Sequence, residues 1–382
     1  MPAVDGKKPS ILGVFGALNS TYVTVHQNRC VVVRNKNANC MKCADACTSD
    51  CITYEDNHLN IEPSRCVGCG TCATVCPSCA LEAHNPSDSE LVSKCEKSKA
   101  ANGGKIVISC IEKVNEAKQA FKEDAIVLTV CLGRIEESVL LKLVSGGARD
   151  LTLVHGDCEN CQLAPGMKTC HKVIETTKVL LDTWEASADI KLQNEFPDCV
   201  LSDGEGAELS LSEESFEEIR EEKESRECVA KYLRVMADGT LPHFIPDRRE
   251  RLLDALADLG EPKEEKINTR LWGHIKIDLK KCVGCKMCTV FCPTGALEQF
   301  VEEKTGTDGI EHRPSDCVKC CCCRDICLGE AIEMEDEIYA PHISSGEVER
   351  YYLPARTTED GGPHSILRHI SKLLDDPEIY ER

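Results

Sequence analysis

The feature that most constrains this chain is a run of four cysteines near residue 290. Cys282, Cys285, Cys288 and Cys292 are spaced C-x2-C-x2-C-x3-C, and Pro293 follows directly. Three thiolates on such a tight loop can bind three irons of one cubane cluster, while the fourth cysteine points to a neighbouring cluster. One run therefore leaves two clusters short of ligands, so a second run is expected nearby.

The second run lies in CVKCCCCRDIC, residues 317–327, which contains six cysteines. The same spacing selects Cys317, Cys320, Cys323 and Cys327 as ligands. A register that begins at Cys320 has no further cysteine downstream, so Cys321 and Cys322 are predicted to be spare. If the fourth cysteine of each run binds the cluster held by the other run, the two runs together predict two [4Fe-4S] sites. The predicted ligands are Cys282, Cys285, Cys288 and Cys327 for one site, and Cys317, Cys320, Cys323 and Cys292 for the other.

Four short segments around these runs have the pattern of strands. They read HIKID, ALEQF, IEHR and AIEME, and they predict a two-fold βαββαβ module. Over residues 270–336 the chain closely resembles the bacterial 2[4Fe-4S] ferredoxin family. It departs from the family pattern at Leu328, which stands where a proline usually follows the last cysteine of the run.

An internal duplication places a similar module near the N-terminus, where CVGCGTCATVCP (66–77) repeats the frame of CVGCKMCTVFCP (282–293). The run that precedes it has one extra residue before its third cysteine and Ile52 in place of proline. The same exchange predicts two more [4Fe-4S] sites. Their predicted ligands are Cys40, Cys43, Cys47 and Cys76, and Cys66, Cys69, Cys72 and Cys51. Cys30 is an alternative to one member of the irregular set.

Two other motifs share part of this spacing. Zinc ribbons also use paired C-x2-C, but a tetrahedral zinc needs four ligands, and each run here continues to a third and fourth thiol. Cys72, Cys76 and Cys79 match the C-x3-C-x2-C of radical S-adenosylmethionine enzymes. That match is embedded in the longer run and no barrel-like stretch follows it, so we interpret it as coincidence.

Between the modules, KIVIS, AIVLTV and LTLVH alternate with helix-like sequence and predict a small parallel α/β domain. Cys110, Cys131, Cys158 and Cys161 fall at or just past the strand ends, where cofactors sit in such sheets. Four thiolates suffice for a [2Fe-2S] cluster. Cys170 is the rival ligand or a buried helix thiol, and a redox-active Cys158–Cys161 dithiol is a further alternative.

Residues 131–161 resemble the delta subunit of methyl-viologen-reducing hydrogenases, which links hydrogenase to heterodisulfide reductase. The resemblance rests on Cys131 with Gly133 and Arg134, on Gly147, Ala148 and Asp150, and on HGDC around Cys158. The family carries C-x2-C where this sequence has only Cys110. The resemblance implies a partner such as a hydrogenase, a molybdopterin enzyme like formate dehydrogenase, or a heterodisulfide-reductase-like flavoprotein.

Composition narrows the class of protein further. The 28 cysteines are about 7 per cent of 382 residues, below the level typical of small disulfide scaffolds. A net charge of −20 disfavours nucleic acid and favours docking on basic protein surfaces. No apolar run reaches the length of a membrane helix, and the N-terminus has no twin-arginine signal. We therefore expect a cytoplasmic protein of an anaerobe, or one peripheral to a membrane complex.

The predicted fold class is mixed α+β and α/β, with two ferredoxin-like βαββαβ dicluster modules around a small parallel α/β domain. The predicted units are an N-terminal 2[4Fe-4S] module (1–95), a delta-subunit-like domain (104–200), an acidic linker and helices (201–268), a C-terminal 2[4Fe-4S] module (269–338) and a docking tail (339–382). Within the linker, Leu252, Leu253, Leu256 and Leu259 form the apolar face of a helix that Gly260 and Pro262 end.

The sequence has no Rossmann fingerprint, Walker loop, nucleophile elbow or HExxH motif. We therefore expect an electron-transfer subunit of a multi-subunit oxidoreductase complex, with four [4Fe-4S] clusters and one [2Fe-2S] cluster. Two alternatives stay open. One is a stand-alone reductase that uses the cysteines of the middle domain, and the other is an iron-sulfur redox sensor.

Overall fold

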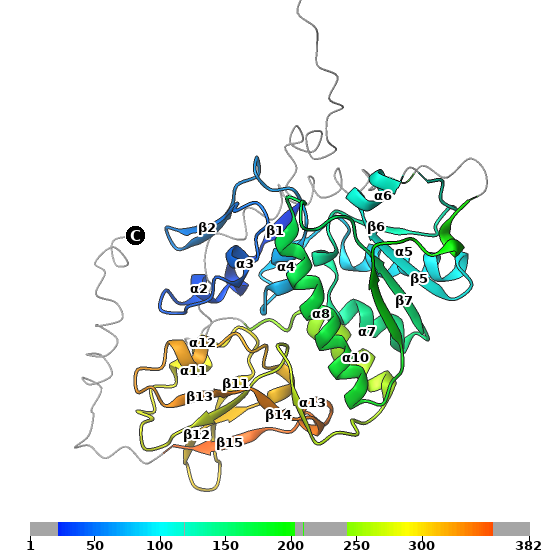
Figure 1. The fold of residues 1–382 in the computed structure, drawn as a ribbon. Coiled ribbons are helices and arrows are strands. Elements are labelled where there is room, and N and C mark those ends of the chain that lie inside the picture. The colour runs from blue at the N-terminus through cyan, green and yellow to red at the C-terminus, as the bar shows by residue number, and fades with distance from the viewer. Residues whose placement is uncertain (1–21, 118, 203–208, 210–242, 354–382) are drawn as a thin grey trace, which may run out of the picture.

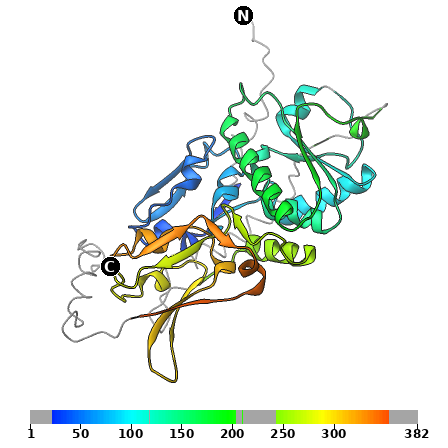
Figure 2. The same cartoon turned by 60° about the horizontal axis from the view of Figure 1, so that its bottom comes forward.

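The computed structural model describes residues 22–117, 119–202, 209 and 243–353. These residues form three packed units, an N-terminal module, a middle domain and a C-terminal module (Figure 1). The N-terminal module lies beside both other units in the two views (Figures 1 and 2). Within the described part of the chain, no helix combines the length and apolar composition needed to cross a membrane.

The N-terminal module contains two small antiparallel sheets. One pairs β1 (Val23–Val25) with β4 (Leu81–Ala83), and the other pairs β2 (Ile52–Glu55) with β3 (His58–Ile61). The short helices between them are α2 (Val31–Arg34), α3 (Lys42–Asp45) and α4 (Thr71–Val75), with a 3-10 turn at Gln27–Arg29. The cysteines are therefore held mainly by loops, and the strands close the module at its ends.

The middle domain is built on a parallel sheet with strand order β6-β5-β7-β8. Its strands are β5 (Lys105–Cys110), β6 (Val127–Thr129), β7 (Asp150–Val154) and β8 (Asp189–Gln193). Its helices are α5 (Asp88–Ala101), α6 (Ile111–Ala117), α7 (Glu137–Ser145) and α8 (Ala164–Thr183), with 3-10 turns at Leu132–Arg134 and Asp198–Val200. Strands β5, β6 and β7 lie where the sequence predicts them, because a sheet covered on both faces needs continuous apolar runs.

The edge strand β8 reads DIKLQ, with Ile190 buried and its two neighbours exposed. It carries no continuous apolar run, which explains why the sequence analysis did not predict it. Helix α5 was also not predicted. It begins at Ser87, which forms a capping box with Glu90, and it places Leu91 and Cys95 in the core of the middle domain.

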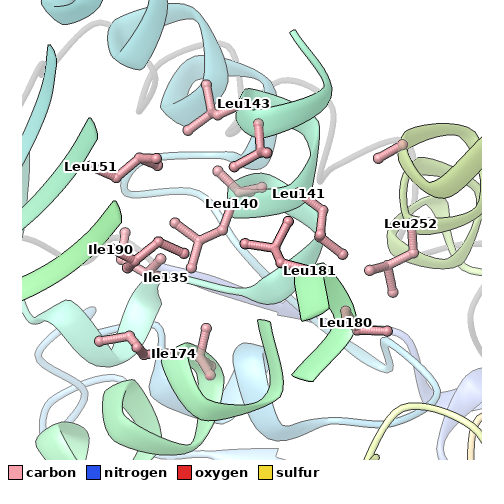
Figure 3. Close-up of a cluster of buried hydrophobic side chains, with 14 of the residues drawn as sticks. Ile135, Leu140, Leu141, Leu143, Leu151, Ile174, Leu180, Leu181, Ile190 and Leu252 are labelled. Carbon is pink, nitrogen blue, oxygen red and sulfur yellow. The ribbon is translucent and has the colours of Figure 1, made fainter. Parts of the chain in front are cut away.

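The main core lies between this sheet and the helices that cover it (Figure 3). Helix α10 (Asp247–Leu259) adds Leu252 and Leu256 to this core and packs on α7. The predicted apolar face of this helix is thus turned inward, and the helix ends at Gly260, whose φ is +98°. Most of the acidic segment before it lies outside the described residues.

In the C-terminal module, β10 (His274–Ile277) pairs with β13 (Ile332–Glu335), and β11 (Leu297–Val301) pairs with β12 (Asp308–His312), both antiparallel. Its short helices are α11 (Met287–Val290) and α12 (Cys322–Asp325), with a 3-10 turn at Pro314–Asp316. These elements lie where the four strand-like segments predict them.

Three further strands and one helix extend the C-terminal module. Strand β9 (Lys266–Asn268) pairs with β14 (Glu337–Tyr339), and α13 (Pro341–Ser345) follows. Strand β15 (Glu349–Tyr352) then adds to β12 as the third strand of its sheet. The first part of the predicted docking tail is therefore integrated into the module, while residues 354–382 lie outside the described residues.

Candidate metal centres

In the C-terminal module the cysteines form two groups, each around its own small cavity. One cavity is lined by Cys282, Cys285, Cys288 and Cys327. The other is lined by Cys292, Cys317, Cys320 and Cys323, together with Cys321 and Cys322. The fold thus brings together both predicted sets, including the fourth cysteines exchanged between the runs.

The two cysteine loops have the same backbone conformation, with positive φ, at two of the positions between their cysteines. In the run that begins at Cys282, Gly284 and Lys286 have φ of 65° and 59°. At the corresponding positions of the second run, Lys319 and Cys321 have φ of 50° and 64°. Such alternation around a loop turns successive N–H groups to one side and forms a concavity for an anion. Cys321 therefore occupies a spacer position.

The other spare thiol, Cys322, is 1% exposed and lies in the first turn of α12. Its Sγ lies 3.8 Å from the carbonyl oxygen of Phe291. Burial and the nearby thiols Cys292 and Cys40 raise its pKa to about 12. Cys322 thus behaves as a small apolar residue at the junction between the N- and C-terminal modules.

The chemistry of these groups fits iron-sulfur clusters. All cysteines in the described part of the chain are free thiols, not disulfides. Burial, followed by neighbouring thiols, raises the pKa of Cys320 and Cys323 well above the ordinary range. Buried thiols without a cation to stabilise the thiolate remain protonated, and metal binding displaces those protons.

In the N-terminal module, five cysteines gather around the regular run. Cys66, Cys69 and Cys72 belong to that run, and Cys47 and Cys51 lie beside it. The Sγ atoms of Cys47 and Cys51 are 3.5 Å apart. Burial raises the pKa of Cys72, and Cys69, Cys43, Cys47 and Cys51 raise it further. A hydrogen bond from Cys51 lowers the pKa of Cys66, so these two thiols are in contact.

A second group contains Cys40, Cys43 and Cys76, as predicted, and Cys30. Burial raises the pKa of Cys43, and its thiol neighbours Cys76, Cys30 and Cys40 raise it further. The pKa of Cys30 is raised to about 11, chiefly by burial and to a smaller extent by Cys76 and Cys40. Cys30 therefore lies where the sequence analysis places Cys47.

The last cysteines of two regular runs, Cys76 and Cys327, share one environment. The backbone N–H four residues later donates to the Sγ, at 3.2 Å from Ala80 to Cys76 and 3.3 Å from Ala331 to Cys327. Cys47 receives the same bond, at 3.4 Å, from the N–H of Cys51. Cys47 thus has the surroundings of a fourth ligand, and Cys51 stands where the other runs have alanine.

Cys30 has the surroundings of a first ligand. A 3-10 turn precedes it at Gln27–Arg29, and its N–H donates to the carbonyl of Gln27 at 3.1 Å. Cys317 follows the turn Pro314–Asp316 with the same bond at 3.1 Å. The sequence signal was the C-x2-C-x3-C of Cys40, Cys43 and Cys47, which matches the last three cysteines of a regular run. The segment containing α2 separates Cys30 from it.

The four predicted ligands of the middle domain line one cavity of about 300 Å³. Cys110 ends β5, Cys131 follows β6, and Cys158 and Cys161 follow β7. The chain reverses its winding direction between β5 and β7, so this is the topological switch point where ligands bind in such sheets. Backbone N–H groups of Gly133 and Leu163 lie 3.4 Å and 3.3 Å from the sulfurs of Cys131 and Cys161.

The alternative ligand Cys170 lies in α8 and is 1% exposed. It is part of the apolar core and does not line the cavity. Burial raises its pKa to about 12, with smaller contributions from Cys158 and Cys110. His155 borders the cavity, and its Nδ1 lies 2.7 Å from the carbonyl oxygen of Gly156 and 3.9 Å from the Sγ of Cys158.

The middle-domain cavity adjoins the N-terminal module. Cys131 and Cys69 share one buried cluster, and Cys69 contributes to the raised pKa of Cys131 after burial. Two glycines permit this approach. A Cβ on Gly166 would lie 2.4 Å from the Sγ of Cys131, and a Cβ on Gly133 would lie 2.5 Å from the hydroxyl of Thr71. A side chain at Gly133 would therefore push on Thr71 of the N-terminal module, and one at Gly166 would first displace Cys131 of its own domain.

Buried arginines hold the three units together. The guanidinium of Arg34 donates to the carbonyl of Cys292 at 3.2 Å, which joins the N- and C-terminal modules. Arg248 of α10 donates to the carbonyls of Thr74 and Cys76, both at 3.1 Å, and forms an ion pair with Glu136 of the middle domain. Arginine suits such junctions because its planar fork satisfies several acceptors at once.

This architecture and these cysteine groups define a protein with [4Fe-4S] ferredoxin domains at two places in the chain. Residues 59–80 and 275–298 match the family model described as 4Fe-4S binding domain. The chain is 35% identical over 54 residues to the Escherichia coli (strain K12) "Putative electron transport protein YsaA", covering 14% of this chain and 34% of that protein. It is 34% identical over 68 residues to a ferredoxin of Rickettsia felis, covering 16% and 60%.

The chain therefore spans less than two thirds of the length of both relatives. Both similarities support a role in electron transfer. No solved structure matches the chain.

Proposed function

We propose that this protein is an electron-transfer subunit that relays single electrons through five iron-sulfur clusters within a multi-subunit redox complex. The observation that carries the proposal is that the five cysteine groups follow one another through the molecule. Each bound cluster supplies a centre that takes up and releases one electron. The protein residues hold the centres, exclude water from them and keep neighbouring centres close.

The succession runs from the middle domain to the C-terminal module. It can be followed through pairs of cysteines that share a buried cluster or line one cavity: Cys131 with Cys69, Cys72 with Cys43, Cys43 with Cys322, Cys322 with Cys292, and Cys292 with Cys288. Each pair bridges one cysteine group and the next, with Cys322 as the intermediate at the module junction. An isolated structural metal site would not require such continuity.

The proposed ligands follow the groups in the fold. In the C-terminal module they are the two predicted sets. In the N-terminal module they are Cys30, Cys40, Cys43 and Cys76 for one [4Fe-4S] cluster, and Cys47, Cys66, Cys69 and Cys72 for the other. In the middle domain Cys110, Cys131, Cys158 and Cys161 hold a [2Fe-2S] cluster. Cys51 is then spare, in contact with the second N-terminal site.

The partner we propose is a hydrogenase, a formate dehydrogenase or a heterodisulfide-reductase-like flavoprotein, as the delta-subunit resemblance implies. A net charge of −20 supports docking on a basic surface. The alternative of a redox-active dithiol is less well supported. The pKa of Cys158 is raised to about 11, chiefly by burial, so its reactive thiolate would be scarce at neutral pH.

The relay predicts a specific redox capacity. Anaerobically purified protein should contain roughly 18 irons per chain and take up about five electrons in a reductive titration followed by EPR. The clusters should survive several redox cycles, because a relay returns to its starting state after each electron. About 8 irons or fewer would refute the five-cluster assignment. Clusters that fall apart during one redox cycle would indicate a sensor.

The four adjacent cysteines of the C-terminal module predict a contrast between neighbouring substitutions. Cys320→Ser or Cys323→Ser should each damage one [4Fe-4S] cluster and lower the iron content by up to about four per chain. Cys321→Ser and Cys322→Ser should leave the iron content unchanged, because Cys321 is a spacer and Cys322 packs at the module junction. Iron and sulfide analysis of the four variants checks this. Loss of iron from Cys321→Ser would show that the register is shifted.

A further inference from the structure

The sheets of the C-terminal module bring two histidines and a glutamate together, away from the cysteine runs. His274 lies on β10, His312 ends β12, and Glu349 begins β15. One nitrogen of each imidazole and one carboxylate oxygen of Glu349 all lie within 4.8 Å of one another. The cluster is built from residues separated by up to 75 positions, so only the fold assembles it.

Strand pairing sets this arrangement. His312 and Glu349 are direct cross-strand partners in the β12–β15 pair, and His274 and Glu335 are direct partners in the β10–β13 pair. The Nε2 of His274 lies 2.8 Å from both carboxylate oxygens of Glu349, which joins the two pairs. The three side chains are therefore held by two separate sheets that meet at this point.

His312 is the unusual member of the cluster. Its side chain is 0% exposed, and neither ring nitrogen has a hydrogen-bond partner among the described residues. Leaving buried polar atoms unpaired is costly, and native structures rarely do so without a reason. Burial also lowers the pKa of His312 to about 3, so the imidazole is neutral and has a lone pair to offer.

We propose that His274, His312 and Glu349 bind a zinc ion that fastens β15 to the rest of the C-terminal module. Two imidazoles and a carboxylate are a donor set that zinc accepts. Tetrahedral zinc with ligands at about 2.0–2.2 Å needs donor atoms roughly 3.3 Å apart, so small movements of these side chains suffice. His342 lies at the edge of this cluster, with its Nδ1 3.6 Å from Oε1 of Glu349.

The surroundings of the cluster support a metal. Glu335 accepts a hydrogen bond from Nδ1 of His274, which leaves Nε2 directed at Glu349 and at the proposed ion. This carboxylate–histidine arrangement is typical of zinc sites, where it orients the ring and raises its basicity. A protonated His274 between two glutamates would satisfy those three residues, but it would leave His312 unpartnered. A zinc ion on one ring nitrogen of His312 would give that residue a partner as well.

The test is zinc analysis of anaerobically purified, full-length protein with its iron-sulfur clusters in place, from cells grown with added zinc. We expect about one zinc per chain, with nitrogen and oxygen neighbours at about 2.0–2.2 Å in zinc X-ray absorption spectra. His312→Ala and Glu349→Gln should lower zinc affinity by more than about 100-fold, and Glu335→Gln by about 10- to 100-fold. His171→Ala, an exposed histidine on α8, is the matched control and should retain zinc.

Iron content measured on the same samples separates this proposal from the electron-transfer role, because the variants should keep their clusters. As a measurement that needs no variant, the intact protein treated with EDTA should rebind one equivalent of zinc chloride. Zinc below about one tenth per chain with no rebinding would overturn the proposal. Zinc with only sulfur neighbours at about 2.3 Å would do the same, because it would place the ion in a cysteine site.

Discussion

Replacing Cys30 by serine is expected to remove one [4Fe-4S] cluster, about four irons per chain, from the N-terminal module. In the fold Cys30 lies with Cys40, Cys43 and Cys76, and it follows a 3-10 turn like that before Cys317. A cubane that loses one thiolate of four is held by three and becomes labile. Iron and sulfide analysis, with EPR of the reduced protein, would measure the loss.

The informative comparison is Cys51→Ser. Cys51 stands where the other runs have alanine, and its N–H donates to Cys47. Serine keeps this backbone bond, so the iron content should not change. Cys199→Ser, outside all the groups, controls for the loss of a thiol. If Cys51→Ser lost about four irons while Cys30→Ser kept them, the ligand set expected from sequence spacing would be correct and ours would fail.

Replacing Glu136 by glutamine is expected to destabilise the junction of the three units by about 3–5 kcal/mol. Glu136 is 0% exposed and pairs with Arg248 and Arg251 of α10. Removing its charge leaves both guanidinium groups in a poorly solvated site with Asp88 as the remaining acidic partner of Arg251. The thermal unfolding midpoint of the cluster-loaded protein should fall by on the order of 10 °C.

The matched control is Asp189→Asn, which breaks the exposed ion pair with Lys191 at 2.6 Å. That change should leave the midpoint unaltered, because exposed pairs contribute little to stability. Limited proteolysis should cut Glu136→Gln faster between the modules than the unaltered chain. Equal midpoints for the two variants would mean that the buried ion pairs do not hold the units together.

The organisation of the C-terminal module was largely predictable from sequence. The spacing of its cysteines predicted two groups, and each group lines one cavity of the fold. The four predicted strands, β10 to β13, also lie where the strand-like segments place them. Both signals are local, because loop geometry depends on residues a few positions apart and strand pattern on every second residue.

In the N-terminal module the grouping of the thiols could not be predicted from cysteine spacing alone. The cysteine spacing predicted Cys51 as the last member of an irregular run and left Cys30 as an alternative to one of its members. The fold instead places Cys30 in the group, across the segment that contains α2. A loop of this length can return to the same site at small entropic cost, so distance along the chain does not exclude a ligand. The edge strand β8 was missed for a different reason, its polar composition.

The sequence by itself determined the kind of chemistry, through cysteine runs whose spacing suits iron-sulfur clusters, and it determined the strands and loops that hold them. Only the tertiary structure decided which thiols lie close together in the N-terminal module, and that His274, His312 and Glu349 meet. The physical reason is the separation in sequence between the residues that interact. Loop and strand patterns arise between near neighbours in sequence, whereas these arrangements depend on strand pairing and on ion pairs between residues up to 163 positions apart.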